Sequence, residues 1–302
     1  MNKKEAPWFY LFISPWLVGF LLLTLGPILF SVYMSFTDWD LFQSPKFIGL
    51  DNYTKLLTDD EVFWKSVFNT FYYALISVPL GLAISLWIAY YLNKKLKGIT
   101  FFRVLFYLPS VVPIVATSLL FVQLFAPTQG LINQTLSWFG IQGPAWLLDA
   151  AWVKPALILT SIWGVGGSIV LLLAGMKGVP TDFYEAAAID GASASQSFFK
   201  ITFPMLTPVI FFNLVTGIIA ALQTFSQVYI MTGGTTNNPG GPDNASQMIV
   251  PYLFQNAFRF FKMGYASAIA WILFLIILAL TLIVFRSSAL WVHYEEGKSS
   301  DS

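Results

Sequence analysis

This sequence has no cysteine and few charged residues. Its 302 residues include no cysteine and one histidine, His293, and only 10% of them are charged. The absence of cysteine excludes disulfides, thiolate metal sites and cysteine nucleophiles. Because about a quarter of the residues of a soluble domain are charged, we expect a protein that lies mostly within a membrane.

The sequence also lacks the signatures of an enzyme or a nucleic-acid-binding protein. The formal net charge is +1, without the basic patch that nucleic-acid binding usually needs, so we expect no nucleic-acid partner. No serine–histidine pair and no paired carboxylates lie in the apolar segments, so we assign no catalytic residue and no metal ligand. The Gly-Lys-Ser at 297–299 lacks the glycine that a phosphate-binding loop needs at Val292, so we expect no ATP site in this chain.

Long apolar runs, in contrast, are abundant: 57% of the residues are hydrophobic and the mean hydropathy is +0.69. A membrane-spanning helix needs about 20 mainly apolar residues. We therefore predict an all-α membrane protein with six transmembrane helices, at roughly 9–36, 68–92, 104–126, 155–176, 205–231 and 263–285. The first charge-free run, from Ala6 to Thr37, is longer than the apolar region of a signal peptide, so we expect an uncleaved helix.

Lysine and arginine are distributed unevenly between the predicted loops. With the N-terminus inside, ten of them lie on the inner side and six on the outer side, and the loop Asn93–Gly98 carries three of the ten. Positively charged loops tend to stay in the cytoplasm. Both termini, and the segment 177–204, are therefore expected to be cytoplasmic.

No charged residue lies within the six predicted spans. Charges inside a membrane are costly and usually mark ion or proton pathways, so their absence disfavours a proton-coupled carrier. Sodium can be held by backbone carbonyls, and sodium coupling stays open. If the protein is an active transporter, its energy is expected to come from another polypeptide.

A polar segment, residues 180–204, interrupts the apolar sequence before the fifth predicted span. Asp182 and Glu185 have the spacing of a capping box at a helix start, and the alanines that follow favour a helix. Gly191 is placed to end this helix in the left-handed conformation. Ser193 and Gln196 repeat the capping pattern and predict a second short helix. From these residues alone, the segment is either a docking element or an ordinary interfacial connection between two spans.

The same segment resembles the "EAA" motif of ABC-importer permeases, which dock this loop into a cleft of an ATPase subunit. The match consists of Glu185-Ala-Ala, Asp190-Gly191-Ala, Phe198, Ile201 and Pro204. The resemblance covers nearly the whole chain and is to the carbohydrate-uptake branch, on the side of the first maltose-type permease subunit. It implies the type I importer permease fold. It also implies a coupling role for Asp182, Glu185, Ala186, Ala187, Asp190, Gly191, Phe198 and Pro204.

The resemblance implies an assembly as well. The expected partners are two copies of an ABC ATPase, which bind the ATP and Mg, a second homologous permease subunit and an extracellular or periplasmic sugar-binding protein. The expected location is the inner membrane of a bacterial or archaeal cell. The expected organisation is an N-terminal part with the first span (1–66), a five-helix core (67–286) containing the coupling loop 177–204, and a cytoplasmic tail (287–302).

Two spans are expected to line the substrate pathway. By resemblance to the sugar-contact positions of the maltose permease, the candidates are Thr160, Trp163, Gly164, Gly167, Gly217, Ala221 and Thr224. The polar neighbours Asn213, Gln223 and Gln227 are added because they can donate hydrogen bonds to a sugar or, alternatively, between helices. The three glycines between 164 and 167 indicate either close packing or a break in the fourth span.

Two other classes of protein remain as alternatives. A stand-alone secondary carrier or channel for a polar, uncharged solute would have no evident use for a docking loop. A purely structural membrane scaffold would not require the glycines beside Trp163.

Overall fold

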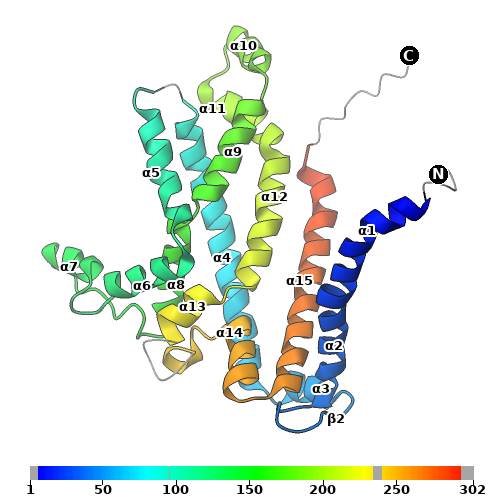
Figure 1. The fold of residues 1–302 in the computed structure, drawn as a ribbon. Helices are drawn as coiled ribbons and strands as arrows, with labels where there is room; N and C mark the ends of the chain where they lie inside the picture. The colour runs from blue at the N-terminus through cyan, green and yellow to red at the C-terminus, as the bar shows by residue number, and fades with distance from the viewer. Residues whose placement is uncertain (1–5, 95, 234–239, 294–302) are drawn as a thin grey trace. The chain divides into compact units, whose positions relative to one another are not determined.

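The computed structural model describes residues 6–94, 96–233 and 240–293, and these are mostly helical (Figure 1). The α-helices are α1 (Ala6–Phe20), α2 (Gly26–Ser35), α3 (Asp51–Thr58), α4 (Glu61–Leu92), α5 (Ile99–Val111), α6 (Ile114–Leu124), α7 (Leu131–Trp138), α8 (Val153–Trp163), α9 (Gly166–Gly178), α10 (Thr181–Ile189), α11 (Ala194–Ser197), α12 (Phe203–Leu222), α13 (Ser226–Val228), α14 (Ile249–Phe254) and α15 (Met263–Trp291). Short π-helical segments η1 (Leu21–Leu25), η2 (Phe198–Thr202), η3 (Tyr229–Gly233) and η5 (Gln255–Arg259) and the 3₁₀ turn η4 (Pro242–Asn244) join some of them. The strands β1 (Thr37–Asp38) and β2 (Lys46–Phe47) form one antiparallel pair.

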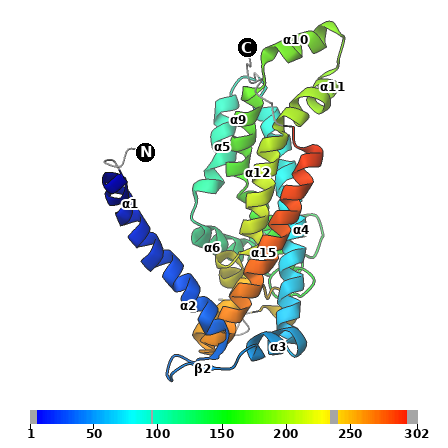
Figure 2. The same ribbon diagram turned by 90° about the vertical axis from the view of Figure 1, so that its right-hand side faces the viewer.

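The chain divides into two compact units. The first contains residues 1–63 and 252–275, and the second contains residues 64–251 and 276–302. Within the second unit, α4, α9 and α12 run side by side in both views (Figures 1 and 2).

Four helices of the described residues are long and apolar enough to cross a membrane: Phe9–Ser35, Glu61–Leu92, Ala194–Leu222 and Met263–Trp291. Two further candidates are bent pairs, α5 with α6 and α8 with α9. The described chain therefore contains four to six candidate spans. Several helices extend beyond the predicted limits, so that Lys65 and Arg286 fall within the ends of α4 and α15.

The third predicted span is not one straight helix. Its two halves, α5 and α6, meet at an angle of 98°. The cause is local, because Val112 precedes Pro113 and has the extended conformation, with φ −71° and ψ 129°. A residue before proline is disfavoured in the helical region, so the helix ends there and restarts after the proline.

The fourth predicted span bends at its glycines, by 46° between α8 and α9. Gly164 and Val165 form the bend, both with ψ close to zero. Gly166 has a different use, since a Cβ atom on it would lie only 2.7 Å from the carbonyl oxygen of Phe106 on α5. The sequence left close packing and a break as alternatives. The structure shows both, because Gly164 forms the bend and Gly166 allows the close packing against α5.

Proline also shapes the fifth span, which is longer at its start than predicted. The helix runs continuously from Ala194 to Leu222, so α11 is its first turn and not a separate helix on the membrane surface. The π-helical segment η2 lies just before Phe203 and Pro204, where the Phe203 amide donates to the Phe198 carbonyl five residues back. This wider turn accommodates the missing N–H of the proline without a break. The same helix ends earlier than predicted, at Leu222 and not at 231.

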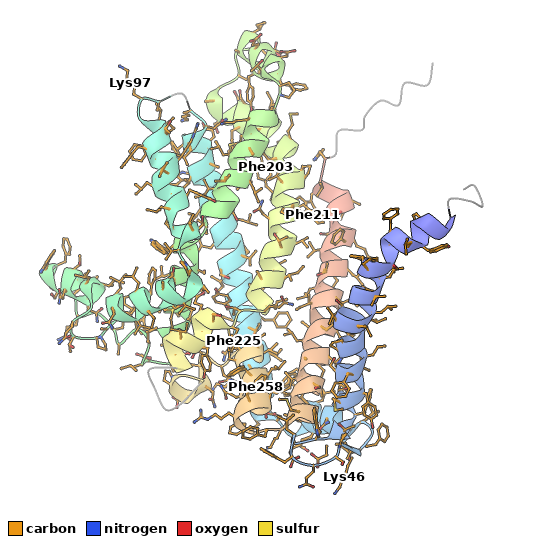
Figure 3. The ribbon with its side chains drawn as sticks, viewed as in Figure 1. Lys46, Lys97, Phe203, Phe211, Phe225 and Phe258 are labelled. Atoms are coloured by element: carbon orange, nitrogen blue, oxygen red, sulfur yellow. The ribbon has the colours of Figure 1, made fainter. Side chains whose placement is uncertain are left out.

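Two apolar clusters hold the second unit together. One contains Phe121, Phe125, Leu157, Leu222 and other buried residues. The other contains Leu92, Leu172, Met176, Leu206 and neighbouring residues, towards the end where Lys97 and α10 lie (Figure 3). Phe211 adds edge-on contacts with Phe285 and Trp291, with ring centroids 5.1 and 5.9 Å away.

In the first unit, polar side chains fix the turns that follow the first span. The side-chain amide of Asn52 donates to the carbonyl oxygens of Ser35 and Thr37, at 3.0 and 2.9 Å. Asp60 accepts hydrogen bonds from the hydroxyls of Tyr252 and Tyr265. Burial, reinforced by the Asp60 carboxylate, raises the pKa of Tyr252, so this phenol stays protonated and keeps donating.

Candidate functional site

The polar segment forms a helix, a glycine turn and a second helix start, as the sequence predicted. Helix α10 ends at Ile189, and Gly191 takes the left-handed conformation with φ +73°. The capping box of the next helix is confirmed. The backbone N–H of Gln196 donates to Ser193 Oγ, and the backbone N–H of Ser193 donates to Gln196 Oε1. Figure 1 shows α10 projecting beyond the ends of α5 and α9.

The predicted capping box at the start of α10 is wrong. Pro180 occupies the cap position, no side chain caps the helix, and Asp182 is already its second residue. A proline in the cap position fixes the backbone direction, and water can satisfy the first amide groups of this exposed turn in place of a side chain. Asp182 remains in the first turn, near the positive end of the helix dipole.

Most of the residues assigned to coupling are accessible. Asp182, Glu185, Ala186, Asp190 and Gly191 are exposed. The apolar residues Phe183 and Ile189 are also exposed, to 49% and 87%. Ala187, Phe198 and Pro204 are partly buried. Helix α10 thus presents carboxylates and apolar side chains together on an open surface.

Two contacts tie this segment to the membrane helices. The Tyr184 hydroxyl on α10 lies 2.8 Å from the Thr202 hydroxyl in η2. The Phe198 ring packs edge-on against Tyr90 of α4, with centroids 4.9 Å apart. A cavity of about 330 Å³ lies beside these contacts, lined in part by Tyr184, Phe198 and Thr202. A displacement of α10 would therefore act directly on the start of the fifth span.

A second feature, which we call the polar cavity, lies between α4, the bend of α8 and α9, and α12. Its volume is about 260 Å³. On α4, on the bent pair of α8 and α9, and on α12, its residues lie at or between the two apolar clusters. Its lining combines hydroxyl, amide and small side chains: Tyr73, Ser77, Val78, Gly81, Leu82, Ser161, Gly164, Val165, Ser168, Asn213, Gly217, Ala220, Ala221 and Thr224. None of these lining residues is charged.

The structure brings together five of the ten residues assigned to the substrate pathway, namely Gly164, Asn213, Gly217, Ala221 and Thr224. The other five lie elsewhere. Thr160 is buried with its hydroxyl bonded to the Ala156 carbonyl, Gly167 is exposed, and Gln223 is exposed where α12 ends. Gln227 is buried, donates to the Leu157 carbonyl at 2.7 Å and accepts from the Tyr73 hydroxyl at 3.2 Å.

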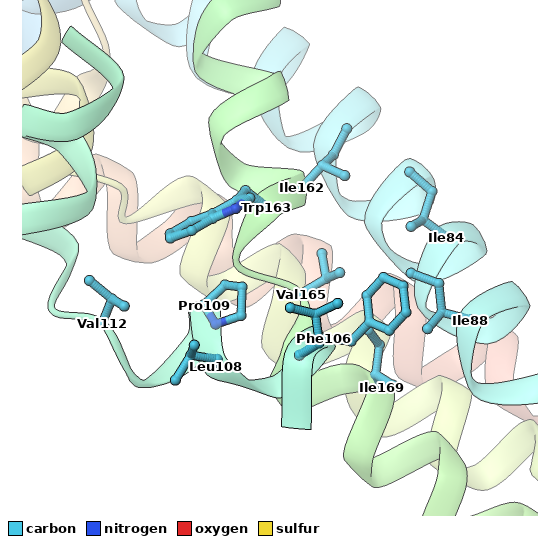
Figure 4. A pocket seen from close by; sticks show the side chains of 11 residues that line it. Ile84, Ile88, Phe106, Leu108, Pro109, Val112, Ile162, Trp163, Val165 and Ile169 are labelled. Carbon is cyan, nitrogen blue, oxygen red and sulfur yellow. The ribbon is translucent and has the colours of Figure 1, made fainter. Parts of the chain in front are cut away.

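Trp163 lines a different cavity, which is apolar and has a volume of about 450 Å³ (Figure 4). Its neighbours there include Ile88, Phe106, Pro109 and Ile169. The indole also packs edge-on against Phe121, with centroids 5.7 Å apart. These contacts give Trp163 a packing role at the bend of α8 and α9 and provide no polar group beside it.

Sequence reasoning missed the contribution of α4. Tyr73, Ser77 and Gly81 follow one another at intervals of four and so lie on one face of α4, whereas Ser161 and Ser168 lie on α8 and α9, on either side of the bend. The polar and small-residue periodicity of α4 was visible in the sequence. Only the packing of α4 against the bend of α8 and α9 and against α12 shows that these residues meet.

Among the described residues, no three histidine, aspartate or glutamate side chains gather in a group that could hold a metal ion. The Gly-Lys-Ser at 297–299 lies outside the described residues. The geometry therefore offers two candidate functional features, the polar cavity and the exposed polar segment at 180–204, which we call the docking segment after its candidate role.

Comparisons with known proteins identify the family of the chain. The family described as the inner membrane component of binding-protein-dependent transport systems matches residues 81–292. The chain is 46% identical over 288 residues to the probable ABC transporter permease protein YesP of Bacillus subtilis (strain 168), covering 95% of this chain and 92% of that protein. It is 34% identical over 285 residues to the lactose transport system permease protein LacF of Rhizobium radiobacter, covering 92% and 93%.

A solved structure shares the fold. It is a bacterial alginate ABC transporter in complex with an alginate pentasaccharide-bound periplasmic protein, and the match has a TM-score of 0.81 at 23% identity. The match covers 94% of this chain and 95% of that chain.

Proposed function

The chain belongs to the family of inner membrane components of binding-protein-dependent transport systems, and from this premise we propose that it is the permease subunit through which a sugar or oligosaccharide enters the cytoplasm. The observation that carries the proposal is the polar cavity, whose lining is uncharged, in a chain whose polar segment at 180–204 is exposed. The chain itself catalyses no reaction in this proposal, because ATP is hydrolysed on separate subunits.

The chemistry of the polar cavity suits a neutral polyol. Tyr73, Ser77, Ser161, Asn213 and Thr224 offer hydroxyl and amide groups that can both donate and accept hydrogen bonds. A sugar hydroxyl needs such partners when it leaves water, since an unpaired buried hydroxyl costs about 1–3 kcal/mol. The lactose permease among the relatives transports a solute of this kind according to its name.

In this proposal, the docking segment is where the energy of ATP hydrolysis reaches the chain. Two ATPase subunits, which hold ATP and Mg, bind α10 of this chain and the corresponding helix of a second, homologous permease. When the two ATPase subunits close on each other, they move both permease chains. A binding protein delivers the sugar from outside, and both termini of this chain face the cytoplasm. The coupling is a two-state change biased by the ATPase's different contacts with the two states.

Co-purification from detergent-solubilised membranes of a bacterial host tests the proposal directly. We expect the tagged chain to bring down an ATPase and a second permease, and the reconstituted complex to hydrolyse ATP faster when the saccharide-loaded binding protein is added. A chain that purifies alone and transports solute in liposomes without ATP would instead be a secondary carrier.

The tie between α10 and the fifth span gives a more local prediction. We expect Tyr184→Phe to lower saccharide uptake by about two- to tenfold, since it removes one hydrogen bond worth about 0.5–1.5 kcal/mol, while leaving the ring in place. The measurement is uptake per ATP hydrolysed in proteoliposomes. Tyr107→Phe on α5 is the matched control, because the Tyr107 side chain lies outside the docking segment and outside the polar cavity. Equal ratios in the two variants would show that the Tyr184–Thr202 contact does not transmit force.

A further inference from the structure

Two lysines, Lys65 and Lys154, lie at the end of the second unit where α4 begins. Lys154 at the start of α8 donates to the side-chain oxygen of Asn69 at 3.1 Å. Lys65 donates to the backbone carbonyl of Asp243. Lys65 is close enough for its charge to act on Lys154. Within the described residues, no carboxylate lies within ion-pair distance of either ammonium group.

Aromatic rings flank the same lysine. The Lys154 ammonium lies 5.3 Å from the centre of the Tyr72 ring and 5.9 Å from that of Phe68. Phe68 is 63% exposed, and Lys154 is half-buried. The ammonium lies over these rings, in a cation–π arrangement. A sugar ring binds by laying its C–H face on an exposed aromatic ring such as that of Phe68, and a cation beside that ring can bind an acidic substituent.

Both ammonium groups keep donors for such a ligand. A lysine ammonium has three N–H donors, and each of these makes one hydrogen bond to a neutral oxygen. Asn69 holds its own position, because its amide nitrogen donates to the carbonyl oxygens of Asn244 and Gln247, at 3.0 and 2.9 Å. The Asn69 oxygen is therefore fixed towards Lys154, and the lysine is positioned without being neutralised.

This cluster is continuous with the polar cavity along two helices. Asn69, Tyr73 and Ser77 follow at intervals of four on α4. Lys154 and Ser161 are seven residues apart on α8, which places them on one face and about 10 Å apart. Each helix thus leads from the cationic cluster at its start to the polar cavity near its middle.

We propose that Lys154 and Lys65, with Asn69 and the rings of Phe68 and Tyr72, form a subsite for the carboxylate of an acidic saccharide. The proposal rests on the permease function and narrows its substrate class to oligosaccharides that contain uronic acid. The polar cavity receives the uncharged hydroxyls, and the cationic cluster selects the acid.

The test compares two trisaccharides on the purified complex in lipid nanodiscs. We expect trigalacturonate to bind at least tenfold more tightly than the neutral maltotriose, measured by saturation-transfer NMR titration, and the difference to shrink as salt is raised. Lys154→Gln should abolish the preference and leave maltotriose binding unchanged. Lys154→Arg should retain it, and Lys97→Gln, in the loop between α4 and α5, is the matched charge-removal control.

Every other outcome overturns the subsite. Equal affinity for the two sugars in the wild type would contradict the subsite. So would an unchanged preference in Lys154→Gln at unchanged thermal stability. In either case, binding of maltotriose would leave the proposed permease function intact. A Lys154→Gln variant that loses capture of the binding protein, with trigalacturonate binding intact, would assign the lysine to protein docking. If neither sugar binds and no ATPase co-purifies, the proposed function fails as well.

Discussion

The variant Gly191→Val is expected to reach the membrane in normal amounts and to lose at least about tenfold of its saccharide uptake. Gly191 holds φ +73° between α10 and α11, a conformation that costs a non-glycine residue about 1–2 kcal/mol, and a β-branched one more. No atom outside its neighbouring residues lies within 4 Å of a Cβ placed there. The strain is therefore relieved by turning α10 away, which misplaces the surface on which, in the proposed function, the ATPase acts.

A second left-handed glycine provides a close control. Gly98 has φ +79°, and a Cβ on it would also meet nothing within 4 Å. It precedes α5 in the loop 93–98, outside the docking segment. Gly98→Val should therefore carry a similar backbone strain with little loss of uptake per molecule of complex. Equal losses in the two variants would mean that strain alone, and not the position of α10, limits transport.

For the polar cavity, we expect Asn213→Leu to lower saccharide binding by about tenfold or more while the complex still assembles. The two side chains have similar size, and the side-chain amide nitrogen of Asn213 donates to the Val209 carbonyl four residues back on the same helix. The substitution thus removes a polar group from the cavity and leaves a sugar hydroxyl unpaired, which costs about 1–3 kcal/mol.

Thr216→Val is the control on the same helix. Its hydroxyl also bonds to a backbone carbonyl four residues back, that of Phe212, but it is exposed and does not line the cavity. Binding of maltotriose to the purified complex measures both variants. If Asn213→Leu binds as the wild type does, the cavity is not where the sugar is held.

The docking segment was the part of the candidate site most open to prediction. Its signals are local, since Gly191 and the Ser193–Gln196 box act within a few residues of themselves, and both are confirmed. The predicted capping box at Asp182 is wrong for a local reason as well, because Pro180 occupies the cap position. The apolar runs likewise predicted the candidate spans, since length and hydropathy alone decide whether a helix can cross a membrane.

The breaks inside the spans were harder to predict from the same signals. Prolines occur at 79, 109, 113 and 208, but only Pro113 coincides with a sharp bend. Whether a helix stops depends on whether neighbouring elements allow the preceding residue to become extended, as Val112 does. Gly164 and Gly166 look alike in sequence, yet one forms a bend and the other admits the Phe106 carbonyl.

The sequence alone determined that this chain is a helical membrane protein with an exposed polar segment built as a helix, a glycine turn and a helix, because composition and capping act through neighbours along the chain. Only the tertiary structure decided which polar residues share a cavity. It joined Tyr73 and Ser77 of α4 to Asn213 of α12 and to Thr224 just after it, and it placed Trp163 in apolar surroundings. The physical reason is that helical periodicity defines the face on which a side chain lies, whereas the packing of helices distant in sequence defines what that face meets.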